Sequence, residues 1–242
     1  MRKGIPLPVL GAILGALLLP SCSEKLARMK GLTDKDFYAR GQQMMAKKNS
    51  GDAIEAFQLL LERFPNSPLA PGAQLSLADA EAASKKDVEA ESAYDDFLRL
   101  YPASDNVPYA LSRKGELLFR QIGSPERDQT KTHEALKTFT RLVEKSPNSP
   151  YAAKARERVK ELRTRLAEHE EAVAAHYLAR KQYDSAEARS RRALADYPDT
   201  SVAPRLLSDL AAALERQGKK EEAAQVRRTL KEKFPDFGAK KK

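Results

Sequence analysis

The chain has 242 residues and a formal net charge of +9; 32% of its residues are charged, 7% are aromatic and none is tryptophan. Glycine (11) and proline (14) are too sparse for a low-complexity chain, while Ala, Leu, Glu, Lys and Arg predominate. These residues lose little side-chain freedom in a helix. The composition therefore excludes a low-complexity protein and predicts an all-helical one with almost no strand.

The N-terminus begins with a short basic segment, continues through the apolar run VLGAILGALLL (9–19) and reaches LPSC (19–22). This order is typical of a secretory signal peptide, and the run is about half of the roughly 20 residues that a membrane-spanning helix needs. The Leu-x-Ser-Cys ending resembles a bacterial lipobox, which implies cleavage before Cys22 and lipid attachment to it. Ser23 then resembles the sorting signal of an outer-membrane lipoprotein. The alternative is an ordinary signal peptide with a bystander cysteine.

Residues 1–21 are thus predicted to be a lipoprotein signal peptide and residues 22–32 a lipidated tether. Cys22 is the single cysteine, so no disulfide can form within the chain. Removing residues 1–21 takes away Arg2 and Lys3 and leaves a charge of +7. In an exported protein such a basic surface points first to anionic lipid headgroups or acidic protein partners, and less to nucleic acid. The basic tail, residues 237–242, is expected to be solvated.

A periodic pattern covers the rest of the chain. Five prolines (65, 102, 147, 198 and 235) each follow an alanine twelve residues earlier, and an aromatic residue stands directly before four of them. These offsets resemble the tetratricopeptide repeat, a helix pair of about 34 residues with small residues where its two helices cross. The small position falls on Gly41, Ala78, Gly115, Ala174 and Ala211.

The repeats predict an all-α, right-handed superhelical solenoid of five helix pairs over residues 33–236, with repeats at about 33–66, 67–103, 105–148, 150–199 and 200–236. The spacings between the prolines are 37, 45, 51 and 37 residues. The 45-residue spacing contains the polar loop QIGSPERDQT (121–130), which we interpret as an insertion in repeat three. The 51-residue spacing predicts one long helix from about Pro150 to Ala179, joining repeats three and four. Repeats four and five lack the aromatic eight residues before the proline, so we expect them to pack differently or to face something else.

The tetrapeptide PNSP occurs twice, at 65–68 and 147–150. We interpret it as a boundary between repeats: its first proline ends a helix, Ser67 or Ser149 caps the next one, and Pro68 or Pro150 takes the first helical position.

Residues for catalysis or metal binding are not arranged in a recognisable pattern. His169 and His176 are seven residues apart, unlike the His-Glu-x-x-His spacing of zinc sites, so we expect them to be exposed or interhelical. The paired carboxylates stand among lysines and arginines at helical spacing and are typical of solvated faces. There is no Gly-rich phosphate loop and no G-x-S-x-G elbow. We predict neither an enzyme nor a cofactor.

The segment RDQTKTHEALKTFTRLVEKSPNSPYAAKARERVKELRTRLAEHEEAVAAHY (127–177), the sequence DYPDT (196–200), the lipobox and the repeat pattern resemble the BamD family of lipoproteins in the outer-membrane β-barrel assembly machinery. The resemblance implies a scaffold anchored at Cys22 in the outer membrane and facing the periplasm. It implies that such a scaffold binds the periplasmic domains of a BamA-like barrel protein and other lipoproteins of the machinery. It further implies recruitment of unfolded outer-membrane proteins for folding and insertion.

In this family the C-terminal repeats form most of the dock for the barrel protein, and an N-terminal groove is proposed to hold substrate segments. For the groove we expect first-helix residues that packing does not need: Tyr38, Gln42 and Arg113. For the dock we expect Arg189, Arg191 and Arg192, a basic patch suited to an acidic surface. A solvated helix face is the alternative for each. The alternative function is another repeat-type outer-membrane lipoprotein: a pilotin, a competence protein or a cell-wall adaptor.

Overall fold

The computed structural model describes residues 31–238, and all secondary structure within that range is helical. The signal peptide, Cys22 and residues 239–242 lie outside the described residues. The helices form five successive pairs: α2 (Asp34–Ala46) with α3 (Ser50–Arg63), α4 (Ala70–Ala83) with α5 (Asp87–Leu100), α6 (Val107–Arg120) with α7 (Thr130–Lys145), α8 (Ala152–Ala179) with α9 (Tyr183–Asp196), and α10 (Ala203–Arg216) with α11 (Lys220–Lys233).

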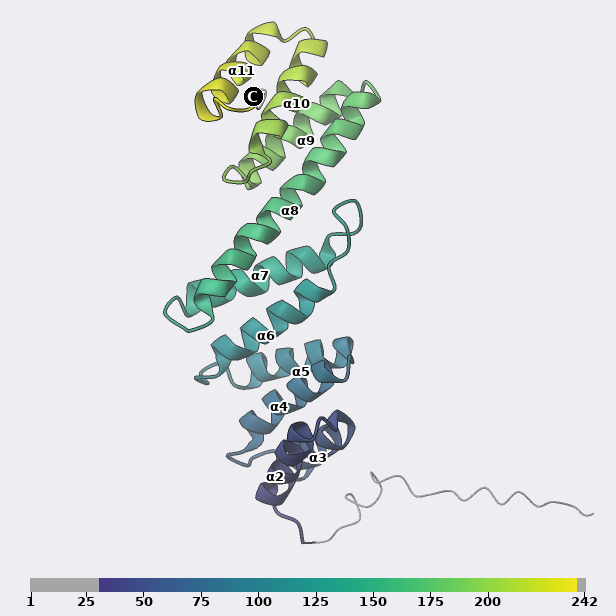
Figure 1. The fold of residues 1–242 in the computed structure, drawn as a ribbon, viewed down its shortest axis with the longest axis vertical. Helices are drawn as coiled ribbons and strands as arrows, with labels where there is room; N and C mark the ends of the chain where they lie inside the picture. Colours follow the sequence, from purple (N-terminus) through teal and green to yellow (C-terminus); the bar gives the residue numbers. More distant parts are fainter. Residues whose placement is uncertain (1–30, 239–242) are drawn as a thin grey trace, which may run out of the picture.

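The pairs stack into an elongated body in chain order (Figure 1). Short connections of residues 47–49, 84–86, 180–182 and 217–219 join the helices within four of the pairs, whereas residues 121–129 join α6 to α7. In Figure 1 the connections α4–α5, α6–α7 and α8–α9 lie on the right of the stack, and the connections between pairs lie on the left. The molecule therefore has two different edges, one built from turns within pairs and one from turns between pairs.

The long helix α8 links the N-terminal three pairs to the C-terminal two. It has 28 residues and contacts α7, α9 and α10, which confirms the uninterrupted helix predicted here. Alanine at 152, 155, 167 and 174 and leucine at 162 and 166 form its buried side. Among the described residues, no helix is both long and apolar enough to span a membrane.

The small residues stand where the helices of a pair cross, as the repeat predicts. A Cβ atom added at Gly115 would lie 2.6 Å from Cε1 of Phe139, and one added at Gly41 would overlap the ring of Phe57. Ala78 is fully buried opposite Tyr94 in the second pair. Side chains bury their apolar area only when the helices approach this closely, so the small residue and the ring function as one packing unit.

The C-terminal pairs pack differently, which confirms that expectation. Ser190 replaces the aromatic residue on α9; it is fully buried and its Oγ has no hydrogen-bond partner. In the last pair Ala223 is the buried residue of α11, and Arg227 is exposed. Little apolar area holds α11 to α10, so the end of the stack is its least stabilised part.

The interpretation of PNSP as a helix cap is wrong in detail. Helices α4 and α8 begin at Ala70 and Ala152, two residues after the second proline, and neither N-cap residue makes a side-chain hydrogen bond. A turn intervenes, in which Ala70 N donates to Ser67 O, and Ala152 N to Ser149 O. Ser67 Oγ accepts from Leu69 N inside that turn. The motif does separate the pairs, but its serines do not cap the helices: the Ser67 hydroxyl and both serine carbonyls bond within the turns, and Ser149 Oγ is buried without a hydrogen-bond partner.

Candidate functional site

The first helices of the N-terminal pairs are joined to one another by polar side chains. Gln42 on α2 donates from Nε2 to Ser76 Oγ on α4 at 3.0 Å. One pair later, Arg113 on α6 donates from Nε to Asp79 Oδ1 on α4 at 3.1 Å. Each bond spans 34 residues. We call the surface of α2, α4 and α6 that carries these bonds the first-helix face.

Asp79 is the centre of the first-helix face. Its Oδ1 accepts from the hydroxyl of Tyr94 at 2.5 Å, and its Oδ2 from the hydroxyl of Tyr109 at 2.6 Å. Burial, followed by the Asp79 carboxylate, raises the pKa of both tyrosines, so both hydroxyls stay protonated as donors. Burial lowers the pKa of Arg113, but Tyr94, Asp79 and Tyr109 together raise it above its ordinary value. The cluster is a charged hydrogen-bond network that joins pair two to pair three.

Tyr38 packs where pairs one and two meet. Its ring lies edge-on to Phe57, with centroids 6.0 Å apart and planes at 63°. Its hydroxyl would be 3.0 Å from a Cβ at Gly72 on α4, so the glycine leaves space for the tyrosine. The three residues predicted to line a groove therefore share the first-helix face, and each contacts the neighbouring pair.

A third link connects α6 to α8. Arg158 donates to both carboxylate oxygens of Glu116, each at 3.1 Å, and Lys154 Nζ lies 3.1 Å from the same group. Burial raises the pKa of Glu116, but Arg158 and Lys154 together lower it below its ordinary value. The Arg158 guanidinium also stacks on Phe119 at 3.8 Å from the ring centroid, a cation–π contact that fixes its plane.

A small cavity of about 220 Å³ lies beside these links. Its lining combines apolar and charged side chains: Ala82, Tyr94, Arg113, Glu116, Leu117, Arg120 and Lys154. Each of its three basic groups faces a carboxylate: Arg113 faces Asp79, Arg120 faces Asp87 and Lys154 faces Glu116. The guanidinium and ammonium hydrogens that these ion pairs leave over suit a carbonyl-rich segment. The sequence prediction included Arg113 but missed Asp79, Tyr94, Tyr109 and Glu116. The 34-residue spacing of complementary polar residues on first helices was the available signal.

The three arginines of α9 point to different neighbours. Arg189 forms an ion pair with Glu170 on α8 at 2.9 Å. Arg191 lies between Glu187 at 2.9 Å and Glu222 on α11 at 2.7 Å. Arg192 has a longer contact with Asp196, at 3.6 Å, and its side chain is 75% exposed. The structure therefore separates the predicted patch into two arginines that hold neighbouring helices and one that faces solvent.

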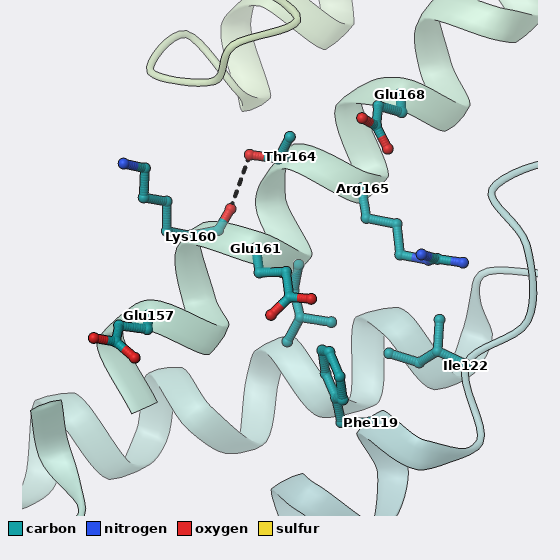
Figure 2. A pocket seen from close by; sticks show the side chains of 9 residues that line it. Phe119, Ile122, Glu157, Lys160, Glu161, Thr164, Arg165 and Glu168 are labelled. Atoms are coloured by element: carbon teal, nitrogen blue, oxygen red, sulfur yellow. Dashed lines mark hydrogen bonds between the residues drawn. The ribbon is translucent and has the colours of Figure 1, made fainter. Parts of the chain in front are cut away.

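A pocket of about 600 Å³ opens between α8 and the end of α6 (Figure 2). Phe119, Ile122 and Leu162 form its apolar part, and Figure 2 shows Arg165 extending from α8 over Ile122. The α8 rim combines three carboxylates with two basic groups: Glu157, Glu161, Glu168, Lys160 and Arg165. These charges nearly balance, so the pocket favours neither anions nor cations strongly.

The segment 121–129 is bound to α8 beside this pocket. Arg165 donates to Gly123 O, and His169 Nδ1 lies 2.6 Å from Pro125 O. Within the segment, the amide of Gln129 donates to the carbonyls of Ser124, Pro125 and Arg127. His169 is therefore a structural residue. His176 is exposed and lies edge-on to Tyr177, and no cluster of potential metal ligands occurs within residues 31–238.

Known proteins show what this chain is similar to. The BamD outer membrane protein assembly factor of Neisseria meningitidis serogroup A is 31% identical over 246 residues, covering 97% of this chain and 92% of the relative. The corresponding factor of Xylella fastidiosa strain 9a5c is 29% identical and covers 85% and 74%. That of Vibrio cholerae is 27% identical and covers 82% and 86%.

Solved structures with related helix stacks are more distant. The TPR2AB-domain:pHSP90 complex of yeast Sti1 matches with a TM-score of 0.45 and 18% identity, over 84% of this chain and 78% of that one. A thermophilic repeat protein from Thermus thermophilus matches with a TM-score of 0.41 and 21% identity, over 84% and 92%.

The family model YfiO, described as outer membrane lipoprotein, matches residues 30–230. This range includes every link of the first-helix face, the long helix α8 and the arginines of α9. The chain therefore belongs to the YfiO family of outer membrane lipoproteins, the family of the BamD assembly factors.

Proposed function

We propose that this chain is an outer membrane protein assembly factor that functions as a non-catalytic scaffold. The observation that carries the proposal is the similarity to BamD assembly factors over 97% of the chain. The geometry supports it, because an elongated helix stack offers long surfaces for protein partners. In this proposal Cys22 carries the lipid anchor, and the protein faces the periplasm from the outer membrane.

The C-terminal pairs form the proposed dock for the periplasmic domains of a BamA-like barrel protein. Arg192 is the proposed direct contact, because its side chain is 75% exposed and its contact with Asp196 is long. Arg189 and Arg191 keep α9 in position through Glu170 and Glu222. An exposed arginine on a rigid helix can form paired hydrogen bonds with a partner carboxylate.

Affinity capture from detergent-solubilised membranes tests the dock. We expect the native chain to recover a barrel protein with periplasmic domains, and Arg192→Glu to recover at least tenfold less, because a single reversed charge makes a contact repulsive. Arg141→Glu is the matched control, since Arg141 is an exposed arginine of α7, outside the C-terminal pairs, and forms no ion pair among residues 31–238. Equal recovery by both variants would remove Arg192 from the dock. Failure of the native chain to recover any barrel protein would overturn the assembly role.

The cavity beside the first-helix face is the proposed contact for extended segments of unfolded outer-membrane proteins. The side chain of Arg113 is 46% exposed although it binds Asp79, so its outer nitrogens remain accessible to a ligand carbonyl or carboxylate. Tyr38 and Gln42 extend the same face toward the N-terminus. A photoreactive residue at Arg120, on the cavity rim, is expected to cross-link an unfolded barrel segment. The same photoreactive residue placed at Arg228, an exposed position on α11, is expected not to cross-link it. Equal cross-linking at both positions would contradict a defined groove.

A further inference from the structure

The N-terminal three helix pairs and the C-terminal two have separate apolar cores. Leu162 of α8 belongs to a core shared with pairs two and three, whereas Ala167 belongs to one shared with Ala193 of α9 and Leu206 of α10. Within residues 31–238, α8 is the only helix in extensive contact with helices of both groups. Contacts between neighbours alone hold a helix stack together, so the orientation of one group relative to the other depends on what surrounds the middle of α8.

The segment 121–129 is long for a connection within a pair, and its shape is fixed from inside. The other four such connections are three residues long. The Gln129 side chain is buried, and its Nε2 donates to the carbonyls of Ser124, Pro125 and Arg127. A bond from Arg127 N to Ser124 O closes a turn within the segment. Because its backbone groups are bonded in this way, the segment holds one conformation.

This segment is bound to α8 beyond the end of the N-terminal core. Arg165 extends from α8 over Ile122 (Figure 2) and donates to Gly123 O. One turn later His169 donates from Nδ1 to Pro125 O at 2.6 Å, since a carbonyl oxygen can only accept. Both residues come after Leu162, which is the last residue of α8 in the N-terminal core. The segment therefore starts and ends in pair three and reaches the part of α8 that packs with pair four.

Charge favours the same contact only weakly. The Ser124 side chain and the backbone of Glu126 itself, followed by Arg165 and His169, hold the pKa of the Glu126 carboxyl below its usual range. Glu126 is exposed, and salt screens the attraction of an exposed carboxylate. The contact therefore depends mainly on the bonds from α8 to the two backbone carbonyls, which are specific in direction.

We propose that residues 121–129 are a brace that fixes the orientation of the C-terminal two pairs relative to the N-terminal three. A long helix curves unless its sides are held, and the bonds at Arg165 and His169 hold α8 where one core ends and the other begins. The consequence for function rests on the proposed function. The first-helix face lies in one group and the α9 arginines in the other, so the brace would set how these two surfaces face each other.

Distances between spin labels test the brace in the full chain in detergent, without any protein partner. The labels are introduced as unnatural amino acids at Ser92 on α5 and Ala188 on α9, two exposed positions in different groups. Their separation is the between-group distance. A second pair of exposed positions, Gln58 on α3 and Ser92, lies within the N-terminal group and gives the reference distance.

Two variants release the brace from opposite sides. Arg165→Ala combined with His169→Ala removes both bonds from α8, and Gln129→Ala removes the three bonds that shape the segment without changing α8. We expect each variant to widen the distribution of the between-group distance about twofold or more, because α8 is then free to bend and twist between the two cores. The reference distance should keep its native distribution in both.

A matched control separates the brace from a general effect of substitutions in α8. Lys160→Ala combined with His176→Ala also removes one cation and one imidazole, from exposed positions that form no hydrogen bond or ion pair with residues 121–129. This control should keep the native between-group distribution. An unchanged distribution in both brace variants would overturn the proposal, as would equal widening in the control. Equal widening of the reference distance would also overturn it, since the loss of order would then be general. The assembly role stands in every case, because no partner is present.

Discussion

Arg113 and Asp79 are 34 residues apart and form an ion pair of 3.1 Å between the first helices of adjacent pairs. Gln42 and Ser76 have the same separation and the same relationship one pair earlier. The period that stacks the apolar side chains also brings complementary polar groups together. The first-helix face is therefore ordered by the stack itself before any ligand arrives, which reduces the entropic cost of binding.

Asp79 should be the most sensitive polar position of this face. Asp79→Ala removes the acceptor of Tyr94, Tyr109 and Arg113 together, leaving the buried Tyr94 hydroxyl and the partly buried Tyr109 hydroxyl without this partner. We expect a loss of about 2–4 kcal/mol in the free energy of unfolding, measured by urea denaturation. Asp96→Ala is the control, because its ion pair with Arg99 is exposed on both sides and should change stability by at most about 0.5 kcal/mol. Equal losses of stability in Asp79→Ala and Asp96→Ala would show that the hydrogen bonds of Asp79 do not stabilise the contact between pairs two and three.

Gly115 should not tolerate even a methyl group. A Cβ there would lie 2.6 Å from Phe139, so Gly115→Ala must displace a fully buried ring at a cost of about 1–3 kcal/mol. Gly51→Ala is the matched control on α3, where the nearest atom is 3.8 Å away and alanine is the better helix former. Thermal unfolding should show a lower midpoint for the first variant and an unchanged or higher one for the second.

The helix pairs and the long helix α8 could be predicted because alanine, glycine and the aromatic residues recur at fixed distances, and packing leaves few alternatives at those positions. The start of the helix after PNSP could not be predicted. A turn in which Ala70 N donates to Ser67 O competes with a helix capped by Ser67, and the two arrangements place the first helical residue only two positions apart. The sequence places the three arginines on one helix, but it does not show which way each side chain points. Ion-pair partners such as Glu222 come from another helix, and their rotation around α9 depends on the packing of α11.

Three lysines hold a backbone conformation that favours glycine. Lys48, Lys85 and Lys181 have φ of 56°, 59° and 61°, and Gly218 takes the equivalent place in the last pair with φ of 81°. Since a left-handed conformation costs a side-chain-bearing residue about 1 kcal/mol, Lys85→Gly should stabilise the chain by about 0.5 kcal/mol after the greater freedom of unfolded glycine is subtracted. Gly218→Ala should destabilise it by a similar amount. Urea denaturation of both variants checks the signs, and a loss of stability in Lys85→Gly would contradict the argument.

Glu81 should make stability depend on pH. Burial, assisted by Glu89, raises the pKa of this carboxyl to about 7, and its Oε2 has no hydrogen-bond partner. The unfolded chain releases the proton near the ordinary value of about 4.5, whereas the folded chain keeps it until about pH 7. The contribution of Glu81 is therefore fully present below pH 4.5 and is lost as the pH rises through 7, by about 1–3 kcal/mol.

Asp209, whose pKa burial raises to about 6, should add a decline of the same sign at slightly lower pH. Glu81→Gln should flatten the decline between pH 5 and 8 and make the variant the more stable protein at pH 8. Asp209→Asn should flatten only its lower part. The free energy of unfolding in urea, measured at half-unit steps for the three proteins, distinguishes these contributions. A native curve that rises across this range, or one that Glu81→Gln leaves unchanged, would show that the Glu81 carboxyl is ionised in the folded protein at neutral pH.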